Sequence, residues 1–155
     1  MRREARMYGR FPRHIQQEYC GFQLIRPIKH PVPTGPVVPK FYGYYVPTNE
    51  KGEAVDNSYR EVEENKDYTV KGPSPILLME ECGEPINPST FSLDDRSECY
   101  SLVLRLHRAG FIQNSFYTRN ILMQRGPLTV PPSERSHRTP SFRIIDFGRG
   151  DIYDN

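Results

Sequence analysis

Two side chains that can supply oxygen ligands lie at the edges of short apolar runs in the second half of the sequence. Asn120 begins the run 120–123, and Asp146 follows the run 142–145. A buried strand in either place fixes the backbone and leaves the polar side chain facing a cleft. Magnesium prefers oxygen ligands of this kind, so the pair predicts a magnesium site in one shared cleft beneath the segment near Cys82. An asparagine cap and an aspartate in a turn before glycine are the ordinary alternatives.

Longer motifs surround these two residues. Residues 113–120 align without gaps on the catalytic-loop pattern His-Arg-Asp-x-x-x-x-Asn of protein kinases, in which only Asn120 matches. The tripeptide Asp146-Phe147-Gly148 matches the kinase Asp-Phe-Gly. An apolar run ending at Glu80 and a helix ending at Gly110 follow the family's order for the hinge strand and the helix before the catalytic loop.

Segment 38–43 is similar to the strand before the hinge region in fungal kinase-like proteins. The chain therefore resembles the protein-kinase-like superfamily of fungal type. This resemblance covers residues 75–150 and extends back to Glu4. It implies an incomplete kinase-like fold, in which 1–79 is a small-lobe remnant, 80–88 the hinge, and 89–155 the start of the large lobe.

The resemblance also implies roles for individual residues. Asn120 and Asp146 take the places of the magnesium ligands, and Glu80 and Cys82 those of hinge residues whose backbone contacts adenine. Glu4 takes the place of the helix glutamate that pairs with the phosphate-binding lysine. ATP and magnesium are the implied cofactors, with weak or absent binding expected. A strand that ends in acidic residues is otherwise ordinary, and side-chain identity says little at the hinge.

Several parts of the kinase pattern are missing. Ser115 stands at the position of the catalytic aspartate, and a neutral hydroxyl cannot act as the general base, whose help is worth about 10²- to 10⁴-fold. A glycine-rich loop and a lysine strand are expected before Glu4, and an activation segment after Asn155. We therefore expect a degenerate kinase, or pseudokinase. A non-catalytic protein-interaction module and an incomplete piece of a longer active kinase remain alternatives.

These residues depend on a small set of predicted elements. The first is a helix that begins at the N-cap Ser92 and ends at the stop signal Gly110. A helix over 4–19 is weakened by Gly9 and Pro12. Strands are predicted at 40–46, at 75–80 with both faces buried, at 120–123 and at 142–145. A charged loop at 48–75 and a flexible proline-rich insertion at 124–141 complete an α+β chain, taken as one partial domain.

Composition narrows the function classes. The chain has 155 residues, 36% of them hydrophobic and 26% charged, and its net charge of +2 is too small to imply nucleic acid as a partner. Three scattered cysteines form no Cys-x-x-Cys pair, and no apolar run suits a signal peptide or a membrane span. An intracellular, cytoplasmic protein is expected, with the nucleus left open. Association with a protein partner is expected through an exposed sheet edge or an apolar helix face.

Overall fold

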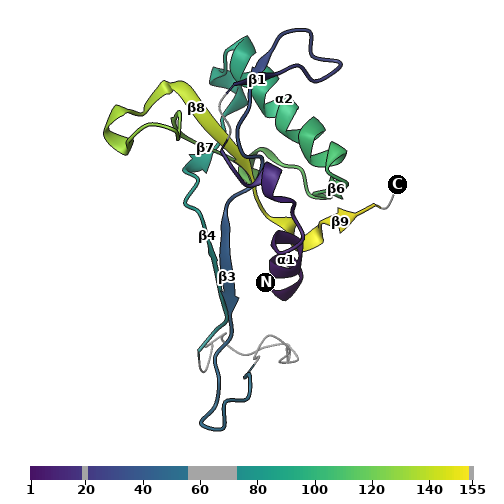
Figure 1. The fold of residues 1–155 in the computed structure, drawn as a ribbon, viewed down its shortest axis with the longest axis vertical. Helices are drawn as coiled ribbons and strands as arrows, with labels where there is room; N and C mark the ends of the chain where they lie inside the picture. Colours follow the sequence, from purple (N-terminus) through teal and green to yellow (C-terminus); the bar gives the residue numbers. More distant parts are fainter. Residues whose placement is uncertain (19–20, 56–72, 154–155) are drawn as a thin grey trace.

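A computed structural model describes residues 1–18, 21–55 and 73–153. Helices and small antiparallel sheets alternate, so the expected α+β class is confirmed (Figure 1). The α-helices and 3₁₀ helices are α1 Arg2–Tyr8, η1 Arg13–Ile15, η3 Pro88–Thr90, α2 Leu93–Arg108, η4 Thr118–Asn120, η5 Pro132–Glu134 and η6 Phe147–Arg149. The strands are β1 Phe22–Gln23, β2 Val32–Pro33, β3 Phe41–Tyr45, β4 Ile76–Met79, β5 Glu84–Pro85, β6 Phe111–Ile112, β7 Ile121–Gly126, β8 Ser136–Ile144 and β9 Asp151–Ile152.

Helix α2 begins where the sequence predicted. The Ser92 hydroxyl accepts from the Asp95 N–H at 3.1 Å, and the Asp95 carboxylate accepts from the Ser92 N–H at 3.1 Å. This reciprocal capping box satisfies two N–H groups that the helix cannot pair internally. Gly110 follows the last turn with φ 86°, a conformation that glycine adopts without steric cost.

The first helix is shorter than predicted. Helix α1 ends at Tyr8, and Gly9 is its C-cap. Pro12 then precedes the separate 3₁₀ turn η1. The expected helix over 4–19 was therefore wrong beyond its first part, because glycine and proline end the helix where the tertiary structure turns the chain.

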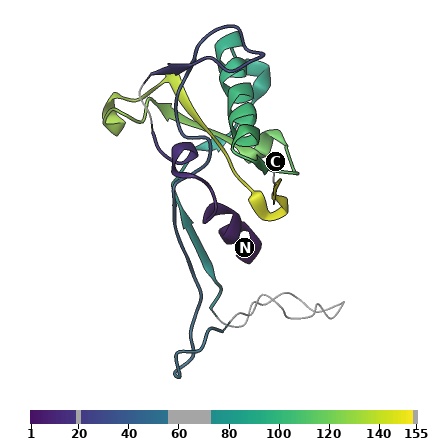
Figure 2. The ribbon, with the colours of Figure 1, turned by 45° about the vertical axis from the view of Figure 1, so that its right-hand side comes forward.

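Strands β3 and β4 form a two-stranded antiparallel ribbon that extends away from the part holding α2, β7 and β8 (Figures 1 and 2). Leu77 and Met79 pack against the core, whereas Ile76 is 60% exposed and Leu78 is 47% exposed. The prediction of a strand buried on both faces was wrong. Successive side chains of a strand point to opposite faces, and only one face of this ribbon meets the core. Of the charged loop 48–75, residues 56–72 lie outside the described residues.

Strand β7 pairs with β5 on one side and with β8 on the other. Its pairing with β8 runs from Ile121 opposite Ile144 to Gly126 opposite Ser136. Much of the proline-rich segment 124–141 therefore belongs to a hairpin, and the expectation of a flexible insertion was wrong for its paired residues. The prolines fall mainly in the turn that joins the two strands, where no ladder hydrogen bond is lost.

One hydrophobic core joins the N-terminal elements to the C-terminal ones. Tyr8 packs edge-on against Phe11 and Phe147 and stacks on Phe41, with ring centroids 5.4, 5.6 and 5.8 Å apart. Phe11 also meets Phe147 at 4.8 Å. These rings hold α1 against η6, the turn that directly follows Asp146.

Candidate functional site

Asn120 and Asp146 meet, as the sequence predicted. The Asn120 amide Nδ2 donates to Asp146 Oδ2 at 3.0 Å and to the Ser115 carbonyl at 2.8 Å. Asn120 is only 4% exposed, whereas Asp146 is exposed. Asp146 has φ 63° and ψ 65°, a left-handed conformation that aspartate tolerates better than most residues. The pair therefore consists of a buried, fixed amide and a carboxylate that faces solvent.

Gln113 fixes the backbone of this turn and was missed from the sequence. Its Nε2 donates to the Ile145 carbonyl at 3.0 Å and to the Asp146 carbonyl at 2.9 Å. Its Oε1 accepts from the Ser115 N–H at 2.8 Å, and the residue is 2% exposed. One buried amide thus ties the segment that carries Ser115 to the segment that carries Asp146. The only sequence signal was its place in the aligned catalytic-loop segment, where it counted as a mismatch.

Glu4 reaches the same turn from α1. Its Oε1 accepts from the Phe147 N–H at 3.3 Å. Burial raises the pKa of Glu4, the Phe147 hydrogen bond opposes that rise, and the nearby Asp146 carboxylate adds to it. The predicted site residues Glu4, Asn120 and Asp146 are therefore gathered around one short segment.

Ser115 lies in the same neighbourhood through its backbone. Its carbonyl accepts from the Tyr117 N–H at 3.0 Å as well as from Asn120, and its N–H is held by Gln113. The backbone at this position is therefore well fixed. The side chain is a neutral hydroxyl, which is a poor general base near neutral pH.

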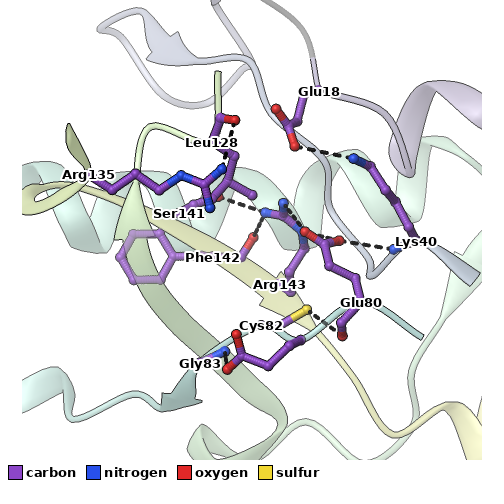
Figure 3. Close-up of polar contacts among 11 residues, drawn as sticks. Glu18, Lys40, Glu80, Cys82, Gly83, Leu128, Arg135, Ser141, Phe142 and Arg143 are labelled. Atoms are coloured by element: carbon purple, nitrogen blue, oxygen red, sulfur yellow. Dashed lines mark hydrogen bonds and ion pairs between the residues drawn. The ribbon is translucent and has the colours of Figure 1, made fainter. Parts of the chain in front are cut away.

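The Glu80 carboxylate lies in a different network, shown in Figure 3. Its two oxygens accept from Arg143 Nη2 at 3.2 Å and Nε at 3.4 Å, and Oε2 also accepts from the Lys40 N–H at 3.0 Å. Arg143 Nη1 donates to Ser141 Oγ and to the Phe142 carbonyl, both at 2.8 Å. Since the Arg143 side chain is 1% exposed, this is a buried, bidentate ion pair. Arg143 was missed from the sequence because it lies inside an apolar run.

The predicted hinge is held close to β7. Cys82 is 3% exposed, and burial, followed by the Glu80 carboxylate, raises the pKa of its thiol to about 12. Such a thiol stays protonated and unreactive. Gly83 has φ 84°, and a Cβ there would lie 2.1 Å from the Met123 carbonyl oxygen. Only glycine fits this close approach.

The geometry separates the predicted site residues into two groups. Glu4, Ser115, Asn120 and Asp146 are linked by hydrogen bonds around Gln113 and Phe147. Glu80 and Cys82 lie at the end of β4, and the strand β8 joins the groups because it carries Arg143 three residues before Asp146.

The Asn120 and Asp146 pair could contribute two oxygen ligands to magnesium, which commonly takes one or two carboxylates and completes its shell with water and phosphate. Within the described ranges, no three His, Cys, Asp or Glu side chains gather closely enough to hold a metal ion by themselves. None of the described helices combines the length and the apolar character needed to cross a bilayer. Comparison with protein-family models, curated proteins and solved structures gave no match.

Proposed function

We propose that this chain is a degenerate kinase-like domain that retains weak binding of magnesium and ATP. The 3.0 Å contact between Asn120 and Asp146 carries the proposal, because the kinase resemblance requires these two side chains to share one site. The position of Glu4 beside Phe147 supports it, since the resemblance puts a helix glutamate next to the Asp-Phe-Gly turn.

Asp146 would be the principal metal ligand, because its carboxylate is charged and exposed. Asn120 would orient that carboxylate and offer its own oxygen from a buried position. Bound magnesium would neutralise the phosphate charge of the nucleotide. Ser115 supplies no general base, so the proposal is binding without efficient phosphoryl transfer.

A thermal-shift titration of the full chain with ATP, with and without magnesium, tests this proposal. Binding to the folded state raises stability by RT ln(1 + [L]/Kd), about 1.4 kcal/mol at ten times Kd. We expect a magnesium-dependent rise in Tm at millimolar ATP, lost in Asp146→Asn and kept in Asp94→Asn. Asp94 is an exposed aspartate in the first turn of α2 and serves as the matched control. No rise in the wild-type chain, or an equal rise in Asp146→Asn, would refute it.

A second candidate function is a non-catalytic module that binds a protein partner. Exposed apolar side chains on the β3–β4 ribbon favour it, namely Tyr42, Tyr45, Ile76 and Leu78. Ile76 lies opposite Tyr45 and Leu78 opposite Gly43, so one face of the ribbon carries much of this surface. Sedimentation equilibrium tests whether the surface drives association: self-association that Leu78→Lys abolishes supports this candidate, and a monomer at all concentrations counts against it.

A further inference from the structure

A hollow of about 390 Å³ lies between helix α1 and strand β9, which come from opposite ends of the described chain (Figure 1). Arg3, Arg6 and Arg10 line it from α1 and the turn that follows. Residues 150–152 line it from the β9 side, and the buried Met7 adds an apolar surface. We call it the α1–β9 hollow.

The three arginines of the hollow differ in what already neutralises them. Arg3 donates to the Gly150 carbonyl at 3.0 Å and lies 3.7 Å from the Asp151 carboxylate, so its charge is partly compensated. Arg6 and Arg10 are exposed, and neither side chain makes a hydrogen bond or an ion pair with any described residue. These two arginines therefore bring two positive charges to the hollow that have no counter-charge in the described chain.

No carboxylate of the same segment faces Arg6 and Arg10. Glu4 is the only acidic residue in 1–14, and its Oε1 accepts from the Phe147 N–H at 3.3 Å. Gly9 has φ −68° and ψ −14°, near the helical region, so Arg10 follows Arg6 by about one turn on the same side of the segment. Like charges in that relation repel each other, and an acidic partner would remove the repulsion.

Strand β9 gives the hollow an open strand edge. Its one neighbour among the described strands is β6, where Phe111 lies opposite Ile152. The Tyr153 N–H donates to the Gly110 carbonyl of that neighbouring segment at 3.1 Å. In an antiparallel ladder the adjacent residue directs its backbone groups to the other side, so the N–H and carbonyl of Ile152 point away from β6. An extended peptide can pair with such an edge.

We propose that the α1–β9 hollow binds an extended acidic peptide of a partner protein. Arg6 and Arg10 are separated by a helical rise of about 6 Å, and alternate side chains of a strand by about 6.6 Å. Two glutamates in the pattern Glu-x-Glu therefore match the two guanidinium groups. A nucleic acid fits less well, because the exposed Asp151 carboxylate repels a chain of phosphates and the strand edge would stay unpaired.

The proposal is independent of the magnesium pair and of the β3–β4 ribbon, because it uses residues of neither.

Fluorescence anisotropy of a labelled Glu-Val-Glu-Val-Glu peptide, titrated with the full chain at low ionic strength, tests the proposal. Three reference peptides accompany it: one with glutamine for glutamate, one rearranged to Glu-Glu-Val-Val-Glu, and one with a methylated backbone that cannot donate hydrogen bonds. We expect each reference peptide to bind about fivefold more weakly or worse, because each loses at least one hydrogen bond or charge pair. Added salt should also weaken the binding of the alternating peptide.

Variants of the chain locate the bound peptide. Arg6→Gln and Arg10→Gln should each weaken binding about fivefold or more, because each removes a charge-assisted hydrogen bond, and the double variant should abolish it. Arg138→Gln, which changes an exposed arginine on β8, is the matched control and should leave the affinity unchanged. Arg6 and Arg10 are exposed, so far-UV circular dichroism of their variants should match that of the wild-type chain.

Three results would overturn the proposal: no binding at millimolar peptide, equal binding of the glutamine or the rearranged peptide, and equal loss in Arg6→Gln and Arg138→Gln. Tighter binding of single-stranded RNA, or of vesicles with anionic lipid, would also overturn it, because the surface would then recognise phosphate groups in general. Asp146→Asn should leave peptide binding unchanged, so a failure of the magnesium site and a failure of this site are distinguishable.

Discussion

The side-chain amide of Asn120 donates to the carboxylate of Asp146 across 3.0 Å, although the two residues are 26 positions apart in the chain. The contact depends on the pairing of β7 with β8, which places Ile121 opposite Ile144. A second bond, from the Ile145 N–H to the Asn120 carbonyl at 2.9 Å, extends that pairing to the edge of the site. The sheet thus fixes a neutral donor beside an exposed carboxylate.

Asn120→Asp should convert this attraction into repulsion. Two carboxylates would face each other at the same separation, and the hydrogen bond would be lost. We expect the free energy of unfolding to fall by about 1–3 kcal/mol without divalent cations. Magnesium should restore much of the loss, because a divalent cation between the carboxylates removes the repulsion. Urea denaturation with and without magnesium measures both effects.

Asn114→Asp is the matched control for that variant. Asn114 is exposed, has φ 60°, and donates to the Arg149 carbonyl at 3.3 Å. Its replacement should cost little and should show no response to magnesium. An equal magnesium response in both variants would mean that the cation acts on general surface charge and not at the pair.

The buried pair of Glu80 and Arg143 should be far more sensitive than an exposed pair. Glu80→Gln leaves the Arg143 guanidinium buried without its counter-charge, which costs about 3–5 kcal/mol. Glu18→Gln breaks the more exposed contact of Glu18 with Lys40 at 3.4 Å and should cost about 1 kcal/mol or less. Both contacts appear in Figure 3, and urea denaturation compares them directly.

A double variant tests whether the loss of stability comes from the unpaired charge of Arg143 or from the other contacts of its side chain. Glu80→Gln combined with Arg143→Met removes both charges and keeps an acceptor for the Lys40 N–H. We expect the double variant to be more stable than Glu80→Gln alone, because no uncompensated charge remains buried. A double variant that is less stable than either single variant would mean that Arg143 acts mainly through its bonds to Ser141 and Phe142.

Local sequence signals predicted the elements that depend on local chemistry. Helix α2 was predicted from Ser92 and Gly110, because capping and chain reversal are decided within a few residues. Strand β3 was predicted over its whole length, but only the first residues of β7 and the last residues of β8 were predicted, in each case from a short apolar or aromatic run. The meeting of Asn120 with Asp146 was predicted from the order of two motifs, and the structure confirms their proximity.

Other features depend on contacts between distant segments and could not be predicted locally. Whether a face of β4 is buried depends on which distant residues cover it, and the apolar run alone does not contain that information. Gln113 and Arg143 become important only because the fold brings carbonyls or a carboxylate to them from 32 and 63 positions away. The length of the β7–β8 hairpin was missed because its prolines indicated a loop.

Removal of the hydroxyl group from Tyr8 and from Tyr153 should change the free energy of unfolding in opposite directions. The Tyr8 hydroxyl is buried without a hydrogen-bond partner among the described residues, and burial raises the pKa of Tyr8 well above its usual range. Tyr8→Phe removes an unsatisfied polar group and should raise the free energy of unfolding by about 1 kcal/mol. The Tyr153 hydroxyl donates to the His107 carbonyl, so Tyr153→Phe should lower it by about 1 kcal/mol. Loss of stability in both variants would imply an ordered water at Tyr8.

The ionisation of Glu98 should make the stability of the chain depend on pH. Burial, aided by Asp95 and opposed by Arg105 and Arg143, raises the pKa of this carboxyl from 4.5 to about 7. Between these values the folded chain binds more protons than the unfolded chain, so the Glu98 contribution to stability falls as pH rises and is lowest above about pH 7. Above about pH 7, ionised Glu98 lowers the free energy of unfolding by about 3 kcal/mol relative to its protonated form.

Glu98→Gln mimics the protonated carboxyl and should remove that penalty. We expect the variant to be more stable than the wild-type chain near pH 8 and nearly equal to it near pH 5, measured by urea denaturation at both values. Glu84→Gln, at an exposed glutamate of β5, should leave the difference between the two pH values unchanged. If Glu98→Gln changed stability equally at both values, the ionisation of Glu98 would not be the cause. The effect of the substitution would then come from a change in packing around the proline-lined cavity that Glu98 borders.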